Sequence, residues 1–514
     1  MSKQGNSCQR NHSINRLILS ALCIVWATAY STPANVMKQP PNILWIMLDD
    51  LRADALSCYG TPWAQTPNMD QIAARGVRFK NAYTQSVICT PSRLSILTGH
   101  YCHTLKEMEM GAKPEIPAGY LPLAAPPLDQ QIDLPSVLSK LDMSPVNVGK
   151  THWSERWDMV PIEEPPRADH ARIDPALRVY DLVRLVSPQP FPPEHGRVSR
   201  RWTIGGGNPL LFDEIKPKII VDAALDVLKK RDPTKPFFLR MSFSAPHIPI
   251  LTPPDFMAPL DSIDIPDPTA EELSTKPYFE RLQLAQYGSV LHLNEEELLV
   301  ARGSYYGLVS FVDYQIGRVI EHLKAHNLLQ NTLIVINSDH GIQLGEHGLY
   351  KKRNFYEQTV AVPLIFSWPG KLPQGMVIDE LVEMIDFLPT VMDLVSIETP
   401  AEIPGRSMMP LIRGEVDSWR EVVFSELDHS MSPYTALRVY SGRRVMVRSK
   451  QWKMIYFRDA RVPSEDGALY DMVGDSGETK NLYNDAEYSE VVSMMKNRVS
   501  DWSEGKQFNP QSRP

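Results

Sequence analysis

The chain has 514 residues, of which 43% are hydrophobic, and this is enough for more than one domain with a buried core. Its formal net charge is −8, so it lacks the basic surplus that is typical of proteins that bind nucleic acid. We therefore expect no nucleic-acid partner.

The first 29 residues have the composition of a secretory signal peptide. Three cationic residues, Lys3, Arg10 and Arg16, precede an apolar run over 17–29, which ends in the small-residue sequence Ala27-Thr28-Ala29. The run is too short for a membrane span, and no later apolar stretch reaches the length that a bilayer requires. We expect a secreted or periplasmic protein without a stable membrane span.

Four apolar runs predict strands, and polar residues follow directly after each. The runs cover 43–48, 145–148, 237–243 and 333–336. Continuous apolar runs of this length are typical of strands that are buried on both faces of a parallel sheet. The polar residues that follow them are Asp49 and Asp50, Lys150 and His152, His247, and Asp339 and His340. Because ligands of open α/β sheets gather beyond the carboxyl ends of the strands, we expect these side chains at one site.

Helices are predicted between the strands, over 69–76, 134–141, 219–230, 302–306 and 311–326. The alternation of strand and helix indicates an α/β catalytic domain with a large, mostly parallel sheet, which we place at 40–400. Two segments of weak periodicity, 155–208 and 252–276, are predicted as long loops near the substrate entrance.

The pattern changes after a helix predicted over 384–395. Short strands are predicted over 422–427, 444–448 and 452–457, and a closing helix over 487–502. We therefore expect a smaller C-terminal α+β domain with an antiparallel sheet over 401–514.

The segment Cys89-Thr90-Pro91-Ser92-Arg93, followed by Leu97-Thr98-Gly99, places a cysteine just before a short helix. Pro91 suits the first helical position and Gly99 a C-terminal cap, which predicts a helix over 91–98. The N–H groups of a helix N-terminus favour an anion, and Arg93 adds a cationic fork that suits oxyanions. The alternative is a buried structural cysteine with a surface arginine. The added proline and Leu-Thr-Gly spacing favour a functional site.

This Cys-x-Pro-x-Arg pattern with its downstream Leu-Thr-Gly resembles the signature of the type I sulfatases of the alkaline phosphatase superfamily. The resemblance extends over most of the chain after residue 29, includes 66–70, 76–79 and 469–471, and is greatest with iduronate-2-sulfatase-like enzymes. It implies the alkaline-phosphatase fold. It also implies that a maturation enzyme converts Cys89 to formylglycine, an aldehyde whose hydrate attacks a sulfate ester.

The carboxylates at the predicted strand ends suggest a metal site. Buried carboxylates without partners are costly, so a cluster of them needs a cation, and oxygen donors suit Ca²⁺ or Mg²⁺. A histidine among them would by itself favour zinc, and any single Asp-Asp pair is also explained by helix caps and loop hydrogen bonds. The resemblance implies calcium, bound by Asp49, Asp50, Asp339 and His340 together with the modified Cys89.

Three further elements match the family. Lys150 and His152 match its Gly-Lys-x-His element, His247 its Pro-His-x-Pro element, and Lys352 its sulfate-binding lysine, although Lys351 stands where the family has aspartate. Taken alone, a Lys-x-His pair is typical of a solvated loop, and a histidine between prolines of a structural role.

The resemblance implies a role for each of these residues. Arg93 and Lys352 hold the sulfate oxygens with calcium. His247 protonates the leaving alkoxide with help from Lys150, and His152 deprotonates the second hydroxyl of the hydrate.

Two other classes of function stay open at the level of sequence. One is a phosphonate or phosphodiester hydrolase of the same superfamily, and the other is a sugar-binding protein whose Cys89 is unmodified. Sulfate monoesters carry less negative charge than phosphate monoesters, and a site with three cationic side chains and two histidines favours sulfate. The resemblance to uronate-type sulfatases favours a sulfated carbohydrate, derived from a polysaccharide, as the substrate.

Cys58 and Cys102 form the one pair that remains when Cys89 is modified and residues 1–29 are removed. A disulfide between them and two free buried thiols are both compatible with the sequence.

Overall fold

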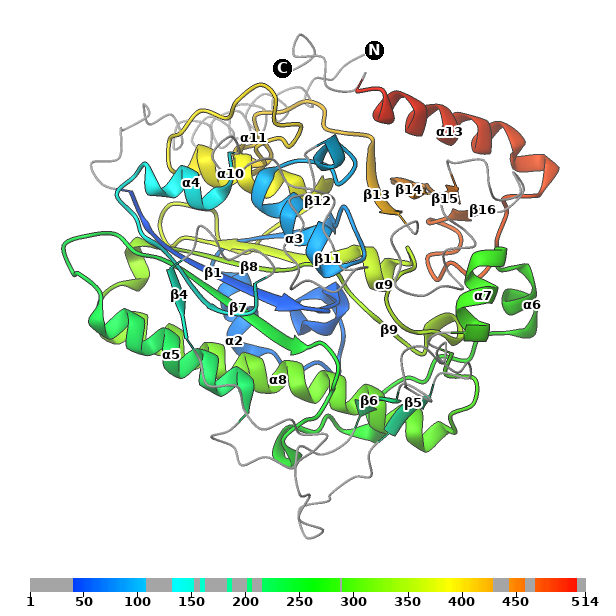
Figure 1. The fold of residues 1–514 in the computed structure, drawn as a ribbon, viewed down its shortest axis with the longest axis horizontal. Helices are drawn as coiled ribbons and strands as arrows, with labels where there is room; N and C mark the ends of the chain where they lie inside the picture. Colours follow the sequence, from blue (N-terminus) through cyan, green and yellow to red (C-terminus); the bar gives the residue numbers. More distant parts are fainter. Residues whose placement is uncertain are drawn as a thin grey trace, which may run out of the picture. The chain divides into compact units, whose positions relative to one another are not determined.

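The computed structural model describes residues 40–107, 132–151, 158–161, 183–186, 201–205, 215–286, 289–428, 443–457 and 467–505. Its largest element is a sheet with the strand order β12-β2-β11-β8-β1-β7-β3-β4 (Figure 1). In this order the strands are Met376–Glu383, Val77–Tyr83, Ala361–Ser367, Thr332–Ser338, Asn42–Asp49, Phe238–Pro246, Pro145–Gly149 and Asp158–Val160. Strand β11 is antiparallel to both of its neighbours, and the other pairs are parallel. The expected large, mostly parallel sheet is confirmed.

The four strands predicted from apolar runs are neighbours in this sheet, in the order β8-β1-β7-β3. Strand β1 pairs on both sides, and all of its residues are buried. Leu44, Ile46 and Leu48 belong to the largest hydrophobic cluster, whereas the ring of Trp45 lies 4.7 Å from that of Phe387 in α10. Both faces of the strand are therefore covered by apolar side chains, which explains its continuous apolar sequence.

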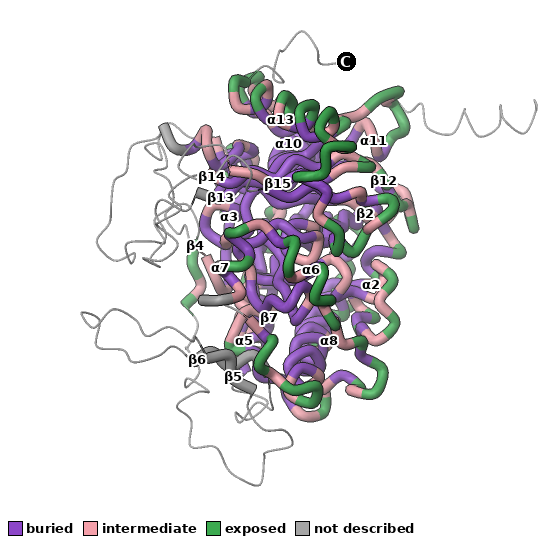
Figure 2. The backbone as a smooth tube through the Cα atoms, turned by 90° about the vertical axis from the view of Figure 1, so that its right-hand side faces the viewer, coloured by how far each residue is buried: buried purple, intermediate pink, exposed green. Residues whose placement is uncertain are grey.

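Helices cover both faces of the sheet (Figure 1). Helices α2 (Pro67–Ala74), α5 (Lys216–Lys230) and α8 (Glu295–Ala325) cover one face, and α3 (Cys89–Thr98), α4 (Leu134–Ser139) and α10 (Phe387–Leu394) lie on the other. In Figure 2, the residues of β7 and α10 are drawn mainly as buried, and exposed residues concentrate on outer elements such as α13.

Four strands of the large sheet, β2, β4, β11 and β12, were not predicted, and the sequences of β11 and β12 explain why these two were missed. Strand β11 contains Pro363, which is unusual inside a sheet, and the pairing with β2 shifts between Val362 and Leu364 at this point. Strand β12 lies at the edge and has a register shift between Ile378 and Leu381. Edge strands and bulges interrupt the apolar patterns that identify central strands.

Helix α8 is one continuous helix of 31 residues, where the sequence predicted two. It begins at a capping box between Asn294 and Glu297. Its glycines, which interrupt the apolar pattern, allow close packing: a Cβ atom on Gly307 would lie 2.4 Å from the carbonyl oxygen of Phe256. The predicted loop 252–276 contains short helical turns and α6 (Ala270–Thr275), followed by α7 (Tyr278–Gln286). Of the other predicted loop, the described parts are β4, β5 (Val183–Val186) and β6 (Arg201–Gly205).

The C-terminal segment forms a four-stranded antiparallel sheet, as expected. Its strands are β13 (Val422–Asp428), β14 (Arg443–Ser449), β15 (Trp452–Phe457) and β16 (Gly467–Asp471), and the chain continues into α13 (Ser489–Ser503). Trp502 of α13 stacks on Phe424 of β13, with ring centroids 4.8 Å apart. Residues 41–514 form one compact unit, and the domain boundary at residue 400 stays a prediction.

Besides short 3-10 helices, the described chain contains four smaller elements: β9 (Gln343–Leu344), β10 (Tyr350–Lys351), α9 (Glu357–Val360) and α11 (Met409–Arg413). Among the described residues, no helix is both long and apolar enough to cross a membrane. Residues 1–29 lie outside the described residues, so the signal peptide stays a prediction.

Candidate active site

The polar residues that follow the four central strands lie, as far as the structure describes them, at one edge of the sheet, as the sequence predicted. In the pairing register, Leu48 is opposite Ser338, Asp49 is opposite Pro246 and Gly149 is opposite Ser242. The residues that follow each strand are therefore brought together by adjacent strands that end at the same level. Parallel pairing places polar side chains from distant parts of the chain side by side.

Helix α3 directs its N-terminus at this edge, and it begins at Cys89 rather than at Pro91 as predicted. Its N-cap is Ile88, whose carbonyl oxygen accepts a hydrogen bond from the N–H of Ser92 at 3.1 Å. The hydroxyl of Ser92 donates to the carbonyl oxygen of Asp339 at 2.5 Å. Position 89 thus lies at a helix N-terminus that is fixed against the end of β8.

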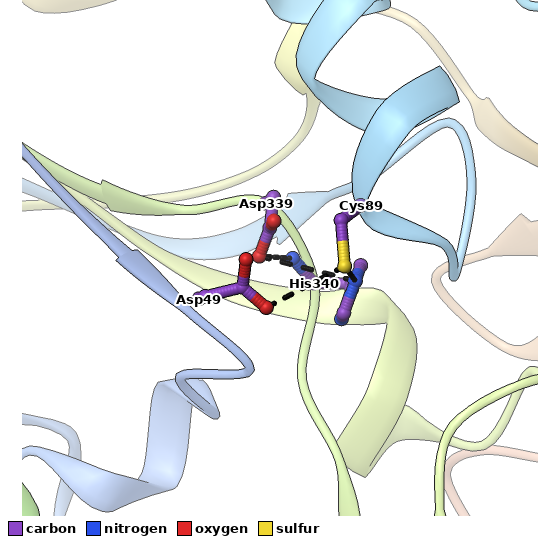
Figure 3. Close-up of side chains that lie close together, drawn as sticks. All are labelled: Asp49, Cys89, Asp339 and His340. Carbon is purple, nitrogen blue, oxygen red and sulfur yellow. Dashed lines mark hydrogen bonds and ion pairs between the residues drawn. The ribbon is translucent and has the colours of Figure 1, made fainter. Parts of the chain in front are cut away.

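Cys89 lies among three buried side chains that can bind a metal ion. Figure 3 shows its sulfur directed at Asp49, Asp339 and His340, and potential ligand atoms of all four lie within 4.8 Å of one another. The sulfur is 3.5 Å from Oδ1 of Asp49 and 3.3 Å from Nε2 of His340. Asp50 is also buried, and its Oδ1 lies 3.1 Å from Nδ1 of His340. The five residues expected to bind a metal are therefore adjacent.

Three cationic side chains surround this group. Arg93 is 3% exposed, and its guanidinium donates from Nε to Oδ2 of Asp339 and from Nη2 to Oδ2 of Asp49, both at 2.8 Å. Lys150 forms an ion pair with Asp49. Lys352 Nζ lies 2.9 Å from both the sulfur of Cys89 and Oδ1 of Asp50. The charges of the buried carboxylates are thus compensated within the site.

The two carboxylates that share Arg93 titrate differently. Burial alone would raise the pKa of Asp49, but Lys150 and Arg93 outweigh it and hold that pKa well below its usual value. Burial and the nearby charge of Asp49 raise the pKa of Asp339. Of these two carboxylates, Asp49 is therefore the one that the cations stabilise more in its ionised form.

The thiol and the imidazole respond to the same charges. Burial and Asp49 raise the pKa of Cys89, but the positive charges of Lys150, Lys352 and His340 outweigh them and lower it well below its usual value. Burial and Lys352 lower the pKa of His340, yet nearby negative charges raise it to about 10. The environment of position 89 therefore stabilises negative charge.

The donor set fits a hard divalent cation. Carboxylate oxygens come from Asp49, Asp50 and Asp339, and His340 adds one nitrogen. Nζ of Lys352 already lies between Oδ1 of Asp50, at 2.9 Å, and Nε2 of His340, at 3.3 Å. Since a positive charge already lies among these donors, they are arranged to bind a cation.

His247 lies at the open side of the site, with 29% of its side chain exposed. Its Nδ1 donates to the carbonyl oxygen of Ile248 at 2.6 Å, because a carbonyl oxygen can only accept. Nε2 faces Asp50 at 3.9 Å from Oδ2 and is the nitrogen available for proton transfer. His152 lies outside the described residues, so its place in the site stays a prediction.

Several residues that hold the site were not found from the sequence. Tyr305 in α8 is one of them: its hydroxyl donates a hydrogen bond at 2.7 Å to the carbonyl oxygen of Asp50, which has a positive φ of 64°. Glu346 is bound by Arg52 at 2.7 Å and by Arg302 at 2.8 Å, which ties the loop after β1 to the loop after β9. These residues are far apart in sequence and have no motif that would identify them.

The sequence left open whether Cys58 and Cys102 form a disulfide. Cys58 and Cys102 are free thiols, so no disulfide joins them. His103, next to Cys102, is mostly buried: its Nδ1 lies 2.9 Å from Glu426, and its ring centroid is 4.4 Å from that of Trp502. These contacts give His103 a structural role between β13 and α13.

Comparison with known proteins identifies the family. Residues 41–397 match the Sulfatase family, and residues 345–505 match the C-terminal family of N-sulphoglucosamine sulphohydrolase. The chain therefore belongs to the sulfatase family and is a hydrolase of that family, in agreement with the expectation from Cys89 and its neighbours.

Three relatives are similar over most of the chain. An arylsulfatase of Clostridium perfringens is 27% identical, over 91% of this chain and 95% of the relative. An N-acetylglucosamine-6-O-sulfatase of Bacteroides thetaiotaomicron is 26% identical, over 93% and 88%. Human iduronate 2-sulfatase is 27% identical, over 76% and 74%. Among solved structures, a phosphonate monoester hydrolase from Silicibacter pomeroyi has the same fold, with a TM-score of 0.70, 22% identity and coverage of 92% and 97%.

Proposed function

We propose that this protein hydrolyses a sulfate ester on a sugar, derived from a polysaccharide, with formylglycine at position 89 and a calcium ion. The observation that carries the proposal is the position of Cys89, at a helix N-terminus and among three carboxylates and three cationic side chains. Such a site stabilises negative charge and excludes most of the solvent, which strengthens electrostatic catalysis. The names of the relatives from Bacteroides thetaiotaomicron and human support a sulfated sugar as the substrate.

When present, calcium supplies positive charge for the sulfate oxygens, and formylglycine supplies the hydroxyl nucleophile. Asp49, Asp50, Asp339 and His340 would hold the ion. Nε, Nη1 and Nη2 of Arg93 all donate to protein acceptors, namely Asp339, Ser242 and Asp49. This geometry supports Arg93 as a residue that orients the carboxylates. The direct sulfate contact that the family resemblance implied stays a proposal for its remaining N–H groups.

The other side chains are placed for contact with substrate and for proton transfer. Lys352, 2.9 Å from the sulfur of Cys89, and Lys150, 4.0 Å from it, lie where a bound sulfate would meet position 89. His247, whose Nε2 lies at the open side 3.9 Å from Asp50, is placed to protonate the leaving oxygen of the sugar. We keep His152 as the proposed base for the second hydroxyl.

The deciding experiment is the mass of the peptide that contains position 89, from protein made in a host with a maturation enzyme, together with assays of sulfate release. We expect the mass deficit of the aldehyde and release of sulfate from sulfated sugars. Hydrolysis of phosphonate monoesters in preference to sulfates would instead support the phosphonate hydrolase alternative. An unmodified thiol in protein from its native host would support a sugar-binding protein.

We also propose that the protein is exported, which rests on the signal peptide predicted in residues 1–29. The N-terminal sequence of protein recovered from the medium or the periplasm tests this. A mature chain that begins near residue 30 supports export, and a full-length chain inside the cell contradicts it.

A further inference from the structure

The loop that carries Lys352 has an unusual backbone. Lys351 and Arg353, on either side of Lys352, have positive φ angles of 80° and 79°. Residues with a side chain rarely adopt this conformation, and it persists only where surrounding contacts enforce it. The side chains that enforce this backbone conformation therefore also determine how firmly the main chain of Lys352 is held.

Two buried side chains from other parts of the chain hold this loop. Nε2 of Gln283, in α7, donates to the carbonyl oxygen of Lys352 at 2.9 Å. Arg444, in β14, donates to the carbonyl oxygen of Arg353. Gln283 is 1% exposed and Arg444 is 2% exposed, so water competes little for either bond.

Arg444 is itself fixed by aromatic rings. Its guanidinium carbon lies 3.4 Å from the ring centroid of Phe279 in α7, and 5.2 Å and 5.8 Å from those of Phe355 and Phe457. A guanidinium over aromatic faces is held by cation–π attraction and by packing. The C-terminal sheet thereby holds the loop beside the active site through one rigid donor.

Packing alone does not explain why the buried side chain at position 283 is an amide. Its Oε1 has no hydrogen-bond partner among the described residues, although it is buried. An apolar side chain of similar size would avoid the cost of burying that oxygen. The hydrogen bond to the carbonyl oxygen of Lys352 is the interaction that requires an amide at position 283.

We propose that Gln283, assisted by Arg444, is a positioning residue that fixes the main chain of Lys352 so that its ammonium stays beside position 89. This inference rests on the proposed function. Lysine has a long and flexible side chain, and its Nζ reaches Cys89 and Asp50 only from a fixed starting point. Preorganised positioning of this kind has large effects on rate, because small displacements weaken contacts with the reacting group.

The test is a double-mutant cycle on the matured enzyme, with an aryl sulfate as substrate. Gln283→Met removes the donor and nearly keeps the volume, and we expect kcat to fall by about 10- to 100-fold. Gln315→Met is the matched control, since Gln315 in α8 is equally buried and its amide likewise has one atom, here Nε2, without a partner among the described residues, while its Oε1 accepts from Arg318 of the same helix. We expect the control to keep wild-type turnover.

In the Lys352→Ala background, Gln283→Met should lower kcat by less than about 2-fold, because its effect acts through the missing lysine. An equal loss in both backgrounds, or no loss in the wild-type background, would overturn the proposal. Wild-type turnover in Lys352→Ala alone would instead contradict the role of Lys352 in the proposed function.

Two further measurements keep the test decisive. Arg444→Lys keeps the positive charge but loses the planar guanidinium. We expect it to lower kcat in the wild-type background and to have little effect in the Lys352→Ala background. An equal loss of kcat in the Lys352→Ala background would count against the proposal. If turnover of the Lys352→Ala enzyme is too low to measure, calorimetry with inorganic sulfate replaces it. Gln283→Met should then weaken sulfate binding only when Lys352 is present, and weakening in both backgrounds would reject positioning.

Discussion

His247→Ala gives a direct test of proton transfer in this site. The side chain is 29% exposed, and its one hydrogen bond joins Nδ1 to the neighbouring carbonyl oxygen of Ile248. Its removal therefore leaves no buried cavity, and we expect the free energy of unfolding to change by less than about 1 kcal/mol. Any loss of activity is then a loss of chemistry, caused by the absence of Nε2.

The size of the loss should depend on the leaving group. A sugar hydroxyl is a very weak acid, so its alkoxide needs a proton as the sulfate bond breaks. General acid catalysis contributes about 10²- to 10⁴-fold, or about 3–5 kcal/mol of activation free energy. A nitrophenol leaves readily as its anion, since even unsubstituted phenols have a pKa of about 10. For such a substrate we expect His247→Ala to lose less than about 10-fold.

The assay compares kcat for 4-nitrocatechol sulfate with kcat for a sulfated sugar such as N-acetylglucosamine 6-sulfate. The matched control is His326→Ala, because His326 is exposed and lies at the end of α8, outside the proposed site. Equal losses on the two substrates would refute the role of His247 as proton donor. Wild-type rates on the sugar substrate would refute any catalytic role.

Three other perturbations have defined outcomes. Cys89→Ala should abolish turnover and leave the circular dichroism spectrum unchanged, and near-normal turnover would contradict the proposed nucleophile. Glu346→Gln should lower the free energy of unfolding by about 3–5 kcal/mol, because two buried arginines lose the negative charge that they share. The exposed control Asp379→Asn should change it by less than about 1 kcal/mol in the same urea titration. Burial raises the pKa of Glu272, but His347 and Lys276 outweigh it and lower that pKa. The stabilisation by its charge is therefore present at neutral pH and lost as pH falls through the lowered pKa. Glu272→Gln should destabilise by about 1–3 kcal/mol near pH 7. The difference should shrink only as pH falls below the ordinary glutamate pKa of about 4.3 and through the lowered pKa, and a difference independent of pH would exclude this ionisation as the cause.

The local sequence was sufficient to predict the strands that bury apolar side chains on both faces of the sheet. The runs that became β1, β3, β7 and β8 are continuous and apolar because central parallel strands contact helices on both sides. Each run is followed by its polar residues, and the rule that parallel strands end at one edge then predicted the site. Cys89 and Arg93 were identified by a short motif at a helix start, which is also a local feature.

The parts that the sequence did not predict depend on contacts between distant residues. Strand β11 contains a proline, and β12 is an edge strand with a bulge, so neither has a clear apolar pattern. Gln283 and Arg444 have no motif, because their importance comes from the carbonyl groups that they reach, which lie 69 and 91 residues away in the chain.

The sequence by itself predicted which residues carry the chemistry and indicated the family to which the chain belongs, because these depend on residue type and local spacing. Only the tertiary structure decided how the charges are shared. In the structure, Arg93 donates hydrogen bonds to two carboxylates and a serine, Nζ of Lys352 lies beside the sulfur of Cys89, and Cys58 and Cys102 are free thiols. Those partnerships depend on which atoms meet when the sheet is assembled, and distance in space is not encoded in local sequence.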